Sequence, residues 1–133
     1  MPHASTQTIS IAAPRDTVLD LVADPARLPE WAPAFAPVIR PDGDDWIVGE
    51  GDQELRVHVR VSRELGTVDF LAAAALPSRE IGAFTRVVPH GDGCAYTFTQ
   101  LFPHDMDDAE IERRRATVAA ELRTVRALCG DGQ

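Results

Sequence analysis

The sequence predicts an α+β domain with one strand, two short helices, six further antiparallel strands and one long C-terminal helix. Three observations give this prediction. Segments of alternating polar and apolar residues recur through the middle of the chain, short turn segments separate them, and a helical stripe of apolar residues fills the last part. The chain has 133 residues, so we expect a single domain over residues 1–133.

The first part of the chain predicts a strand followed by a short helix. Residues 8–12 alternate polar with apolar, and Pro14 stands near the first position of the helix that follows. Val18 and Val22 lie on one face of this helix, which ends before Pro25. Residues 25–37 contain four prolines, so we expect only helical turns and loop there.

From residue 38 onward the pattern indicates strands. The clearest alternation has Leu55, Val57, Val59 and Val61 on one face. The connections are too short for crossovers, so successive strands should pair antiparallel in a meander. We expect strands near residues 38–40, 46–49, 54–61, 67–74, 80–88 and 94–102.

The last hairpin sets which side chains point inward. A turn about Gly91 and Asp92 would pair Val87 with Tyr96, Thr85 with Phe98, Ala83 with Gln100 and Ile81 with Phe102. We expect this more apolar face to point inward together with Leu55, Val57, Val59, Val68 and Phe70. A bulge in the turn would shift the register by one residue and invert the assignment.

A helix of about 23 residues should run between Asp107, with a capping pattern to Glu110, and Gly130. Its stripe lies against the sheet and consists of Ile111, Arg115, Val118, Leu122, Val125 and Cys129. The helix and the last strand cover similar lengths of roughly 30 to 35 Å in opposite directions, so Cys94 and Cys129 should lie near one another. In a reducing compartment we do not expect a disulfide between them.

Composition excludes several function classes. The chain carries 21 acidic and 13 basic residues, a net charge of -8, so nucleic acid is not an expected partner. All basic residues are Arg, which excludes Schiff-base chemistry on a lysine. Neither a signal segment nor a membrane span is predicted, and we expect a cytoplasmic protein without membrane insertion. The four His are dispersed and the two Cys fit no zinc spacing, so we expect no metal and no cofactor.

Several motifs resemble one known superfamily. They are residues 9–14 followed by Val18, residues 22–25 with 28–31, and residues 89–93. With the order of elements, they resemble the START/Bet v 1-like (SRPBCC) superfamily and, within it, the polyketide cyclase/dehydrase-like proteins. The resemblance implies the helix-grip fold, a curved seven-stranded sheet wrapped around the C-terminal helix. It also implies an apolar cavity between them that binds lipids, polyketides or other hydrophobic molecules.

The sequence also indicates a cavity and its lining. Small residues at Ala72, Ala74, Gly82 and Ala83 leave space along the strands. Trp31 and Phe35 form either a hydrophobic gate or a core plug, while Arg115 reaches either the rim or the ligand. Tyr96 and Gln100 either orient a ligand or bond backbone and water. The expected ligand-binding residues are Trp31, Phe35, Val57, Val59, Phe70, Thr85, Tyr96, Phe98, Gln100, Arg115, Val118 and Leu122.

The expected function is binding of a hydrophobic or aromatic small molecule, such as a lipid, a polyketide or a quinone-like compound. The alternative is a polyketide cyclase/dehydratase that folds a poly-carbonyl chain in the same cavity without a metal or a covalent intermediate. A third, weaker possibility is a protein that shields a quinone or a partner surface. We expect a monomer or a homodimer.

Overall fold

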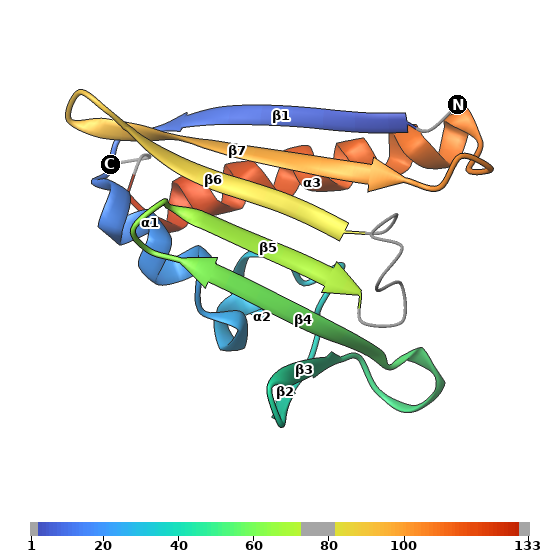
Figure 1. The fold of residues 1–133 in the computed structure, drawn as a ribbon. Coiled ribbons are helices and arrows are strands. Elements are labelled where there is room, and N and C mark those ends of the chain that lie inside the picture. The colour runs from blue at the N-terminus through green and yellow to red at the C-terminus, as the bar shows by residue number, and fades with distance from the viewer. Residues whose placement is uncertain (1–2, 73–81, 131–133) are drawn as a thin grey trace.

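The computed structural model describes residues 3–72 and 82–130, and it confirms the predicted α+β helix-grip fold (Figure 1). The elements are β1 (His3–Ile11), α1 (Arg15–Val22), η1 (Pro25–Arg27), α2 (Leu28–Trp31), β2 (Ile39–Asp42), β3 (Asp45–Val48), η2 (Gly51–Gln53), β4 (Leu55–Ser62), β5 (Thr67–Ala72), β6 (Gly82–His90), β7 (Gly93–Phe102) and α3 (Asp108–Leu128). Ala74, Ile81 and the turn expected at residues 76–78 lie outside the described residues.

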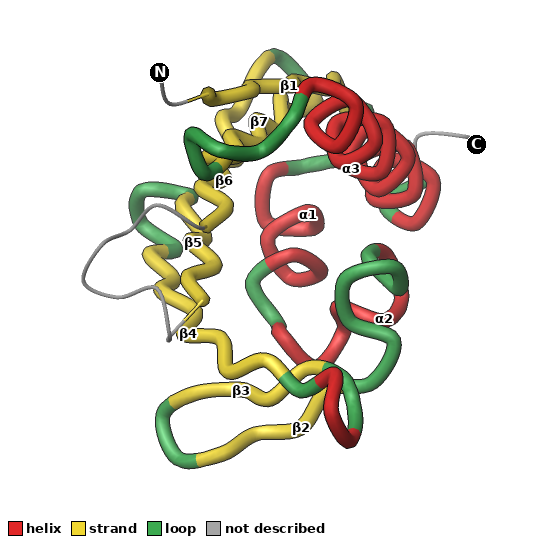
Figure 2. Tube along the Cα trace, turned by 90° about the vertical axis from the view of Figure 1, so that its right-hand side faces the viewer, coloured by secondary structure: helices red, strands yellow, loops and turns green. Residues whose placement is uncertain are grey.

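The seven strands form one antiparallel sheet in the order β1-β7-β6-β5-β4-β3-β2. Viewed from the end, the sheet curves as an arc, and the three α-helices lie on its concave side (Figure 2). The second to seventh strands follow the meander expected from their short connections. The first strand closes the opposite edge by pairing with β7.

The register of the β6–β7 hairpin is the predicted one. Val87 faces Tyr96, Thr85 faces Phe98 and Ala83 faces Gln100. His90 pairs with Gly93, so the loop consists of Gly91 and Asp92 only, and no bulge shifts the pairing. Gly91 has a φ of 59°, the left-handed conformation that two-residue hairpin loops require.

The first strand is longer than its alternation indicates, because it begins at His3 rather than near residue 8. Its early residues are polar on both faces. On the outer face, the hydroxyls of Thr6 and Thr99 hydrogen-bond at 2.9 Å. On the inner face, the Gln7 amide donates to the backbone oxygen of Arg115 on α3, also at 2.9 Å. Here β1 faces a polar stretch of α3 and not the apolar core, so its inward side chains are polar.

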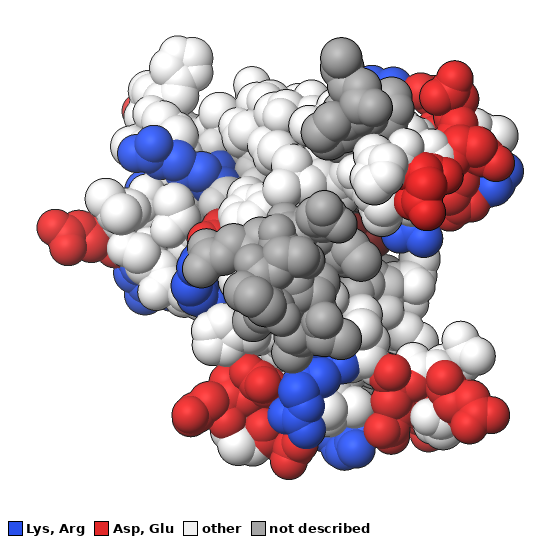
Figure 3. All heavy atoms as spheres, turned by 45° about the vertical axis from the view of Figure 1, so that its right-hand side comes forward, with Lys and Arg blue, Asp and Glu red and all other residues white. Residues whose placement is uncertain are grey.

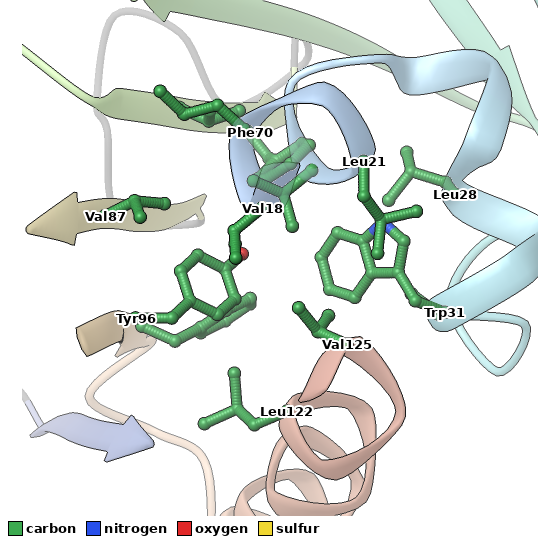
Figure 4. Packing of buried hydrophobic residues seen from close by; sticks show 14 of the residues in the cluster. Val18, Leu21, Leu28, Trp31, Phe70, Val87, Tyr96, Leu122 and Val125 are labelled. Carbon is green, nitrogen blue, oxygen red and sulfur yellow. The ribbon is translucent and has the colours of Figure 1, made fainter. Parts of the chain in front are cut away.

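The first helix fills one half of the space inside the arc. Val18, Leu19, Leu21 and Val22 are almost fully buried and pack beside Tyr96 and Val87 of the sheet and Leu122 and Val125 of α3 (Figure 4). Burial of each such aliphatic side chain contributes about 1.5 to 3 kcal/mol relative to exposure. This half of the molecule is therefore a solid core.

The last helix begins as predicted. The Asp107 carboxylate accepts a hydrogen bond of 2.8 Å from the backbone N–H of Glu110 and so caps the first turn. At the other end, Cys129 and the strand residue Cys94 are free thiols. Burial raises the pKa of both, and Cys94 adds to the rise at Cys129, so the two groups are near enough to interact.

Candidate functional site

A cavity of about 630 Å³ lies in the other half of the arc, between the sheet and the helices α2 and α3. Most of its lining is apolar, and strands β4 to β7 supply its wall. The space remains because α1 does not reach this end of the sheet and because the strands carry small residues here. Ala72, Gly82 and Ala83 all line the cavity, as the sequence predicted for them.

The cavity has a buried end and an open end. Trp31 and Val118 line it and are 1% and 4% exposed, so they lie at the buried end, next to the solid core. Phe35 and Leu55 also line it but are 40% and 36% exposed, which places them at the mouth. A ligand would therefore enter past Phe35 and Leu55 and reach toward Trp31.

Some of the residues expected to bind a ligand line this cavity and others do not. Those in the lining are Trp31, Phe35, Val57, Phe70, Phe98, Gln100 and Val118. Those outside it are Val59, Thr85, Tyr96, Arg115 and Leu122. Thr85, Tyr96 and Leu122 are on the expected inner face but belong to the half filled by α1, and Val59 packs against the same core.

The two aromatic residues of the proline-rich segment take different places. Trp31 packs edge to face on Phe70 and on Tyr96, with ring centroids 6.4 Å apart in both pairs (Figure 4). It forms the wall that separates the solid core from the cavity. Phe35 lies at the mouth, where a side chain that is partly exposed is free to contact an entering ligand.

The Arg115 side chain lies outside the cavity, on the side of α3 that faces β1. Its Nε donates to the Ser5 hydroxyl at 2.9 Å, and its Nη1 donates to the Glu112 carboxylate at 2.7 Å. The Arg115 side chain is 45% exposed. This agrees with the rim position, one of the two alternatives that the sequence left open. These partners satisfy the charge without any group from the cavity.

Glu121 of α3 also lines the cavity, although its position in the sequence did not mark it as a site residue. It is 7% exposed, and the structure gives it no hydrogen bond or ion pair with any residue it describes. Burial raises the pKa of this carboxyl to about 7. Its charge also contributes to the raised pKa of Tyr96, a buried neighbour on the core side. Glu121 is therefore a carboxyl group at the buried end of an apolar space.

A signal for Glu121 exists in the helical spacing. It follows Val118 by three residues and precedes Val125 by four, so it lies on the flank of the buried stripe, about 60° from Val118. Arg115 lies about 60° away on the opposite flank. The stripe alone does not tell on which flank the cavity opens, because that depends on where β1 meets the helix.

Glu110, a second carboxylate of α3 in the lining, is more exposed than Glu121, with 34% of its side chain accessible. Arg114 donates to it through Nε at 2.9 Å, and Arg113 donates through Nε at 3.0 Å. These two hydrogen bonds lower the pKa of Glu110. Glu110, Arg114 and Thr117 line the cavity as a polar strip that leads from the mouth toward Glu121.

Gln100 is the polar residue that the sheet contributes to the lining. Its Oε1 is buried and has no hydrogen-bond partner among the residues described, and the same holds for Nε1 of Trp31. An unpaired buried polar atom costs about 1 to 3 kcal/mol. The cavity region thus contains polar groups whose hydrogen bonds are not met by the protein residues around them.

The described part of the chain does not bring together the side chains of a metal site or of a second catalytic site. His58 hydrogen-bonds to Asp45 at 2.9 Å on the sheet face away from Val57. Within residues 3–72 and 82–130, no three His, Cys, Asp or Glu side chains are placed to share a metal ion. Of the helices described there, none has the length and apolar character needed to cross a membrane.

Comparison with known proteins agrees with this architecture. Residues 2–130 match the family described as polyketide cyclase / dehydrase and lipid transport. A search of curated proteins gives no match.

Among solved structures, XoxI from Bacillus cereus is similar with a TM-score of 0.76 and 14% identity, over 96% of both chains. The Aha1 dimer from Colwellia psychrerythraea has a TM-score of 0.76 and 14% identity, over 98% of both. The Zhui aromatase/cyclase from a Streptomyces species has a TM-score of 0.71 and 13% identity, over 97% of this chain and 94% of that one. At these identities the likeness shows the fold alone.

Proposed function

The chain belongs to the polyketide cyclase / dehydrase and lipid transport family, and from that premise we propose that it binds a hydrophobic or aromatic small molecule in the cavity between its sheet and α3. The observation that carries the proposal is the cavity itself. About 630 Å³ is in the range of small-molecule sites, and an apolar lining with a few polar groups is their usual composition.

The lining combines an apolar wall with two polar side chains, and each part has its own role in binding. Val57, Phe70 and Phe98 form an apolar wall on the sheet side, which suits an aromatic or aliphatic body. Glu121 on α3 and Gln100 on β7 provide the polar groups that fix the orientation of such a body. The mouth at Phe35 and Leu55 lets the ligand enter without unfolding of the sheet.

The test is titration with N-phenylnaphthylamine, a neutral fluorescent probe of apolar sites. We expect saturable binding with one probe per chain. Ala83→Trp fills the cavity from the sheet side and should abolish this binding. Ala120→Trp places the same side chain on the exposed side of α3 and is the control, since it should leave binding unchanged. Absence of a saturable site, or equal binding by both variants, would refute the proposal.

The natural ligand can be sought directly. Mass spectrometry of compounds extracted from the purified native protein should detect a hydrophobic or aromatic molecule that the Ala83→Trp variant does not retain. The Ala120→Trp variant should retain it.

Glu121 favours a second candidate, a cyclase/dehydratase. A carboxyl group with a pKa of about 7 can both accept and donate a proton near neutral pH. Its carboxylate would take a proton from the methylene between two substrate carbonyls. The resulting enolate carbon would bond to a distant carbonyl carbon, and the alkoxide so formed would take the proton back. Loss of water from this aldol product would then leave a carbon–carbon double bond.

A turnover assay distinguishes a binding protein from a cyclase/dehydratase. A synthetic poly-carbonyl compound incubated with the cyclase would lose the mass of one water and gain an aromatic absorbance band. Glu121→Gln should abolish this change while the compound still binds. If the compound binds and leaves unchanged from the wild-type protein, binding without catalysis is the function.

A further inference from the structure

We infer that Glu121 selects the ligand: the cavity takes an apolar molecule that places an O–H or N–H donor on this carboxyl group, and it rejects molecules with a carboxylate at that end. This inference rests on the proposed binding function and specifies its ligand class. Its basis is the position of one carboxyl group inside a mostly apolar cavity, where no described residue forms a hydrogen bond or an ion pair with it.

Glu121 needs a hydrogen-bond donor or an opposite charge. A buried carboxylate is costly unless hydrogen bonds or an opposite charge compensate it. Glu121 has neither from the residues described, although it is only 7% exposed. Stability alone would favour an apolar side chain at this position, where Val118, Leu122 and Val125 surround it on the helix. Since no described residue supplies this donor, we assign it to the ligand that occupies the cavity.

Among residues 3–72 and 82–130, no cationic side chain pairs with Glu121. Arg114 lines the same cavity, but its Nε is bound to Glu110 at 2.9 Å. Arg115 is bound to Glu112 and Ser5 outside the cavity. The strand residues of the lining, among them Phe70, Phe98 and Gln100, are uncharged. A cationic or hydroxylic ligand group would therefore be the partner of Glu121. A ligand carboxylate would be repelled whenever Glu121 is ionised.

The position of Glu121 along α3 would orient the ligand. Along α3, Glu110 and Glu121 are eleven residues apart, which is about 16 Å at the helical rise. Glu110 lies on the mouth side and Glu121 beside the buried Val118, so the ligand's polar end would enter first. Its apolar body would then lie along Phe70 and Phe98 and end near Phe35.

The electrostatic field of the whole chain acts on the same ligands. The chain carries a net charge of -8, and acidic side chains, with arginines among them, are exposed over the start of α3 and around the β2–β3 hairpin (Figure 3). Such a field raises the local concentration of cations and lowers that of anions. The long-range charge and the buried carboxyl therefore favour the same ligands.

The experiment uses four naphthalene derivatives of similar size as probes. Naphthylmethylamine offers an ammonium, naphthalenemethanol a hydroxyl, ethylnaphthalene no polar group and naphthylacetate a carboxylate. At about pH 8, with Glu121 ionised, we expect the ammonium probe to bind at least tenfold more tightly than ethylnaphthalene. The hydroxyl probe should rank between these two, and the carboxylate probe should bind most weakly.

Two matched variants, Glu121→Gln and Glu112→Gln, test whether Glu121 causes this ranking of the probes. Glu121→Gln removes the charge and keeps the shape, so the ammonium probe should lose its tenfold advantage while the hydroxyl probe changes by less than about threefold, since an amide oxygen still accepts a hydrogen bond. Glu112→Gln removes the same charge from the outer side of α3, where Glu112 contacts Arg115, and should preserve the ranking.

A pH change tests the same point in the unaltered protein. At about pH 5.5 Glu121 is protonated, and the advantage of the ammonium probe should disappear. The other carboxyl in the lining, Glu110, stays ionised because its pKa is lowered, and Tyr96 stays neutral because its pKa is raised. Arg114 remains bound to Glu110.

The outcomes separate the two proposals. If no probe binds, the proposed binding function fails and the inference fails with it. If the probes bind but rank alike in the wild-type protein and in Glu121→Gln, or if the carboxylate probe binds best, the cavity binds ligands and Glu121 does not select them.

Discussion

Glu121 lowers the stability of the folded protein at neutral pH, because burial disfavours its ionised form. Its pKa rises from 4.5 to about 7 on folding. The folded state therefore holds more protons than the unfolded state between these two values. The free energy of unfolding falls as the pH rises through this window and is highest, for this group, below the unfolded pKa.

The Glu121→Gln variant should remove this pH dependence. We expect the variant and the wild-type protein to have similar free energies of unfolding at about pH 4, and the variant to be more stable by up to about 3 kcal/mol at about pH 8. Urea unfolding at a series of pH values measures the difference, with Glu112→Gln as the charge control. A constant difference across the series would mean that burial does not perturb Glu121.

For single residues, the sequence predicted which apolar side chains point to the inner face of the sheet. It placed Val57, Phe70 and Phe98 on the inner face, where they line the cavity. It did not single out Glu121, because an acid on a helix is usually solvated and the apolar stripe has two flanks. Only the contact of β1 with Arg115 shows which flank is covered by the sheet and which borders the cavity.

At the scale of elements, the β6–β7 hairpin contains two glycines that serve different purposes. Gly91 has a positive φ of 59° and open space where a side chain would project. At Gly93 a Cβ would overlap the backbone carbonyl oxygen of Ile11 on β1. The first glycine permits the turn, and the second permits β1 to approach β7.

These two glycines should differ in the cost of substitution by alanine. Gly91→Ala strains only the turn and should destabilise the protein by about 1 kcal/mol. Gly93→Ala forces β1 away from β7 and should cost more than about 2 kcal/mol. Denaturant midpoints of both variants, compared at equal slope, measure this. Equal costs would show that β1 adjusts freely at Ile11.

The N-terminal end of α3 depends on its capping residue. Asp107→Ala removes the acceptor for the backbone N–H of Glu110 and should cost about 1 kcal/mol. Asp105→Ala, an exposed neighbour in the preceding loop, should cost less than about 0.5 kcal/mol. Thermal unfolding of both variants checks the prediction, and a larger loss for Asp105→Ala would contradict it.

The elements themselves were predictable because their signals are local. Alternation, turn residues and the capping pattern gave the strands, the hairpin register and α3. The position of α1 along the sheet has no such signal. For this reason Thr85, Tyr96 and Leu122 were expected to line a cavity and instead lie in the half that α1 fills. Strand alternation predicts which face of the sheet a residue lies on. It does not predict whether a helix packs against that residue or leaves it beside a cavity.

At the scale of the whole molecule, one half of the space inside the arc holds the packed core that stabilises the fold, and the other half holds the cavity. The half around α1 holds almost fully buried residues such as Val18, Leu19 and Tyr96 and is solid. The other half encloses about 630 Å³ without a packed core. Unfilled apolar space forgoes dispersion contacts, so an occupant that fits the cavity adds stability that the chain alone lacks.

Occupation of the cavity should therefore stabilise the entire fold. A ligand present at 100 times its Kd adds about 2.7 kcal/mol to the free energy of unfolding if it binds the folded state only. For a domain of this size each kcal/mol raises Tm by about 3 to 5 °C, so saturating N-phenylnaphthylamine should raise Tm by about 10 °C. The Ala83→Trp variant should show no rise, whereas Ala120→Trp should behave as the wild-type protein does. An equal rise in both variants would place the stabilising site outside the cavity.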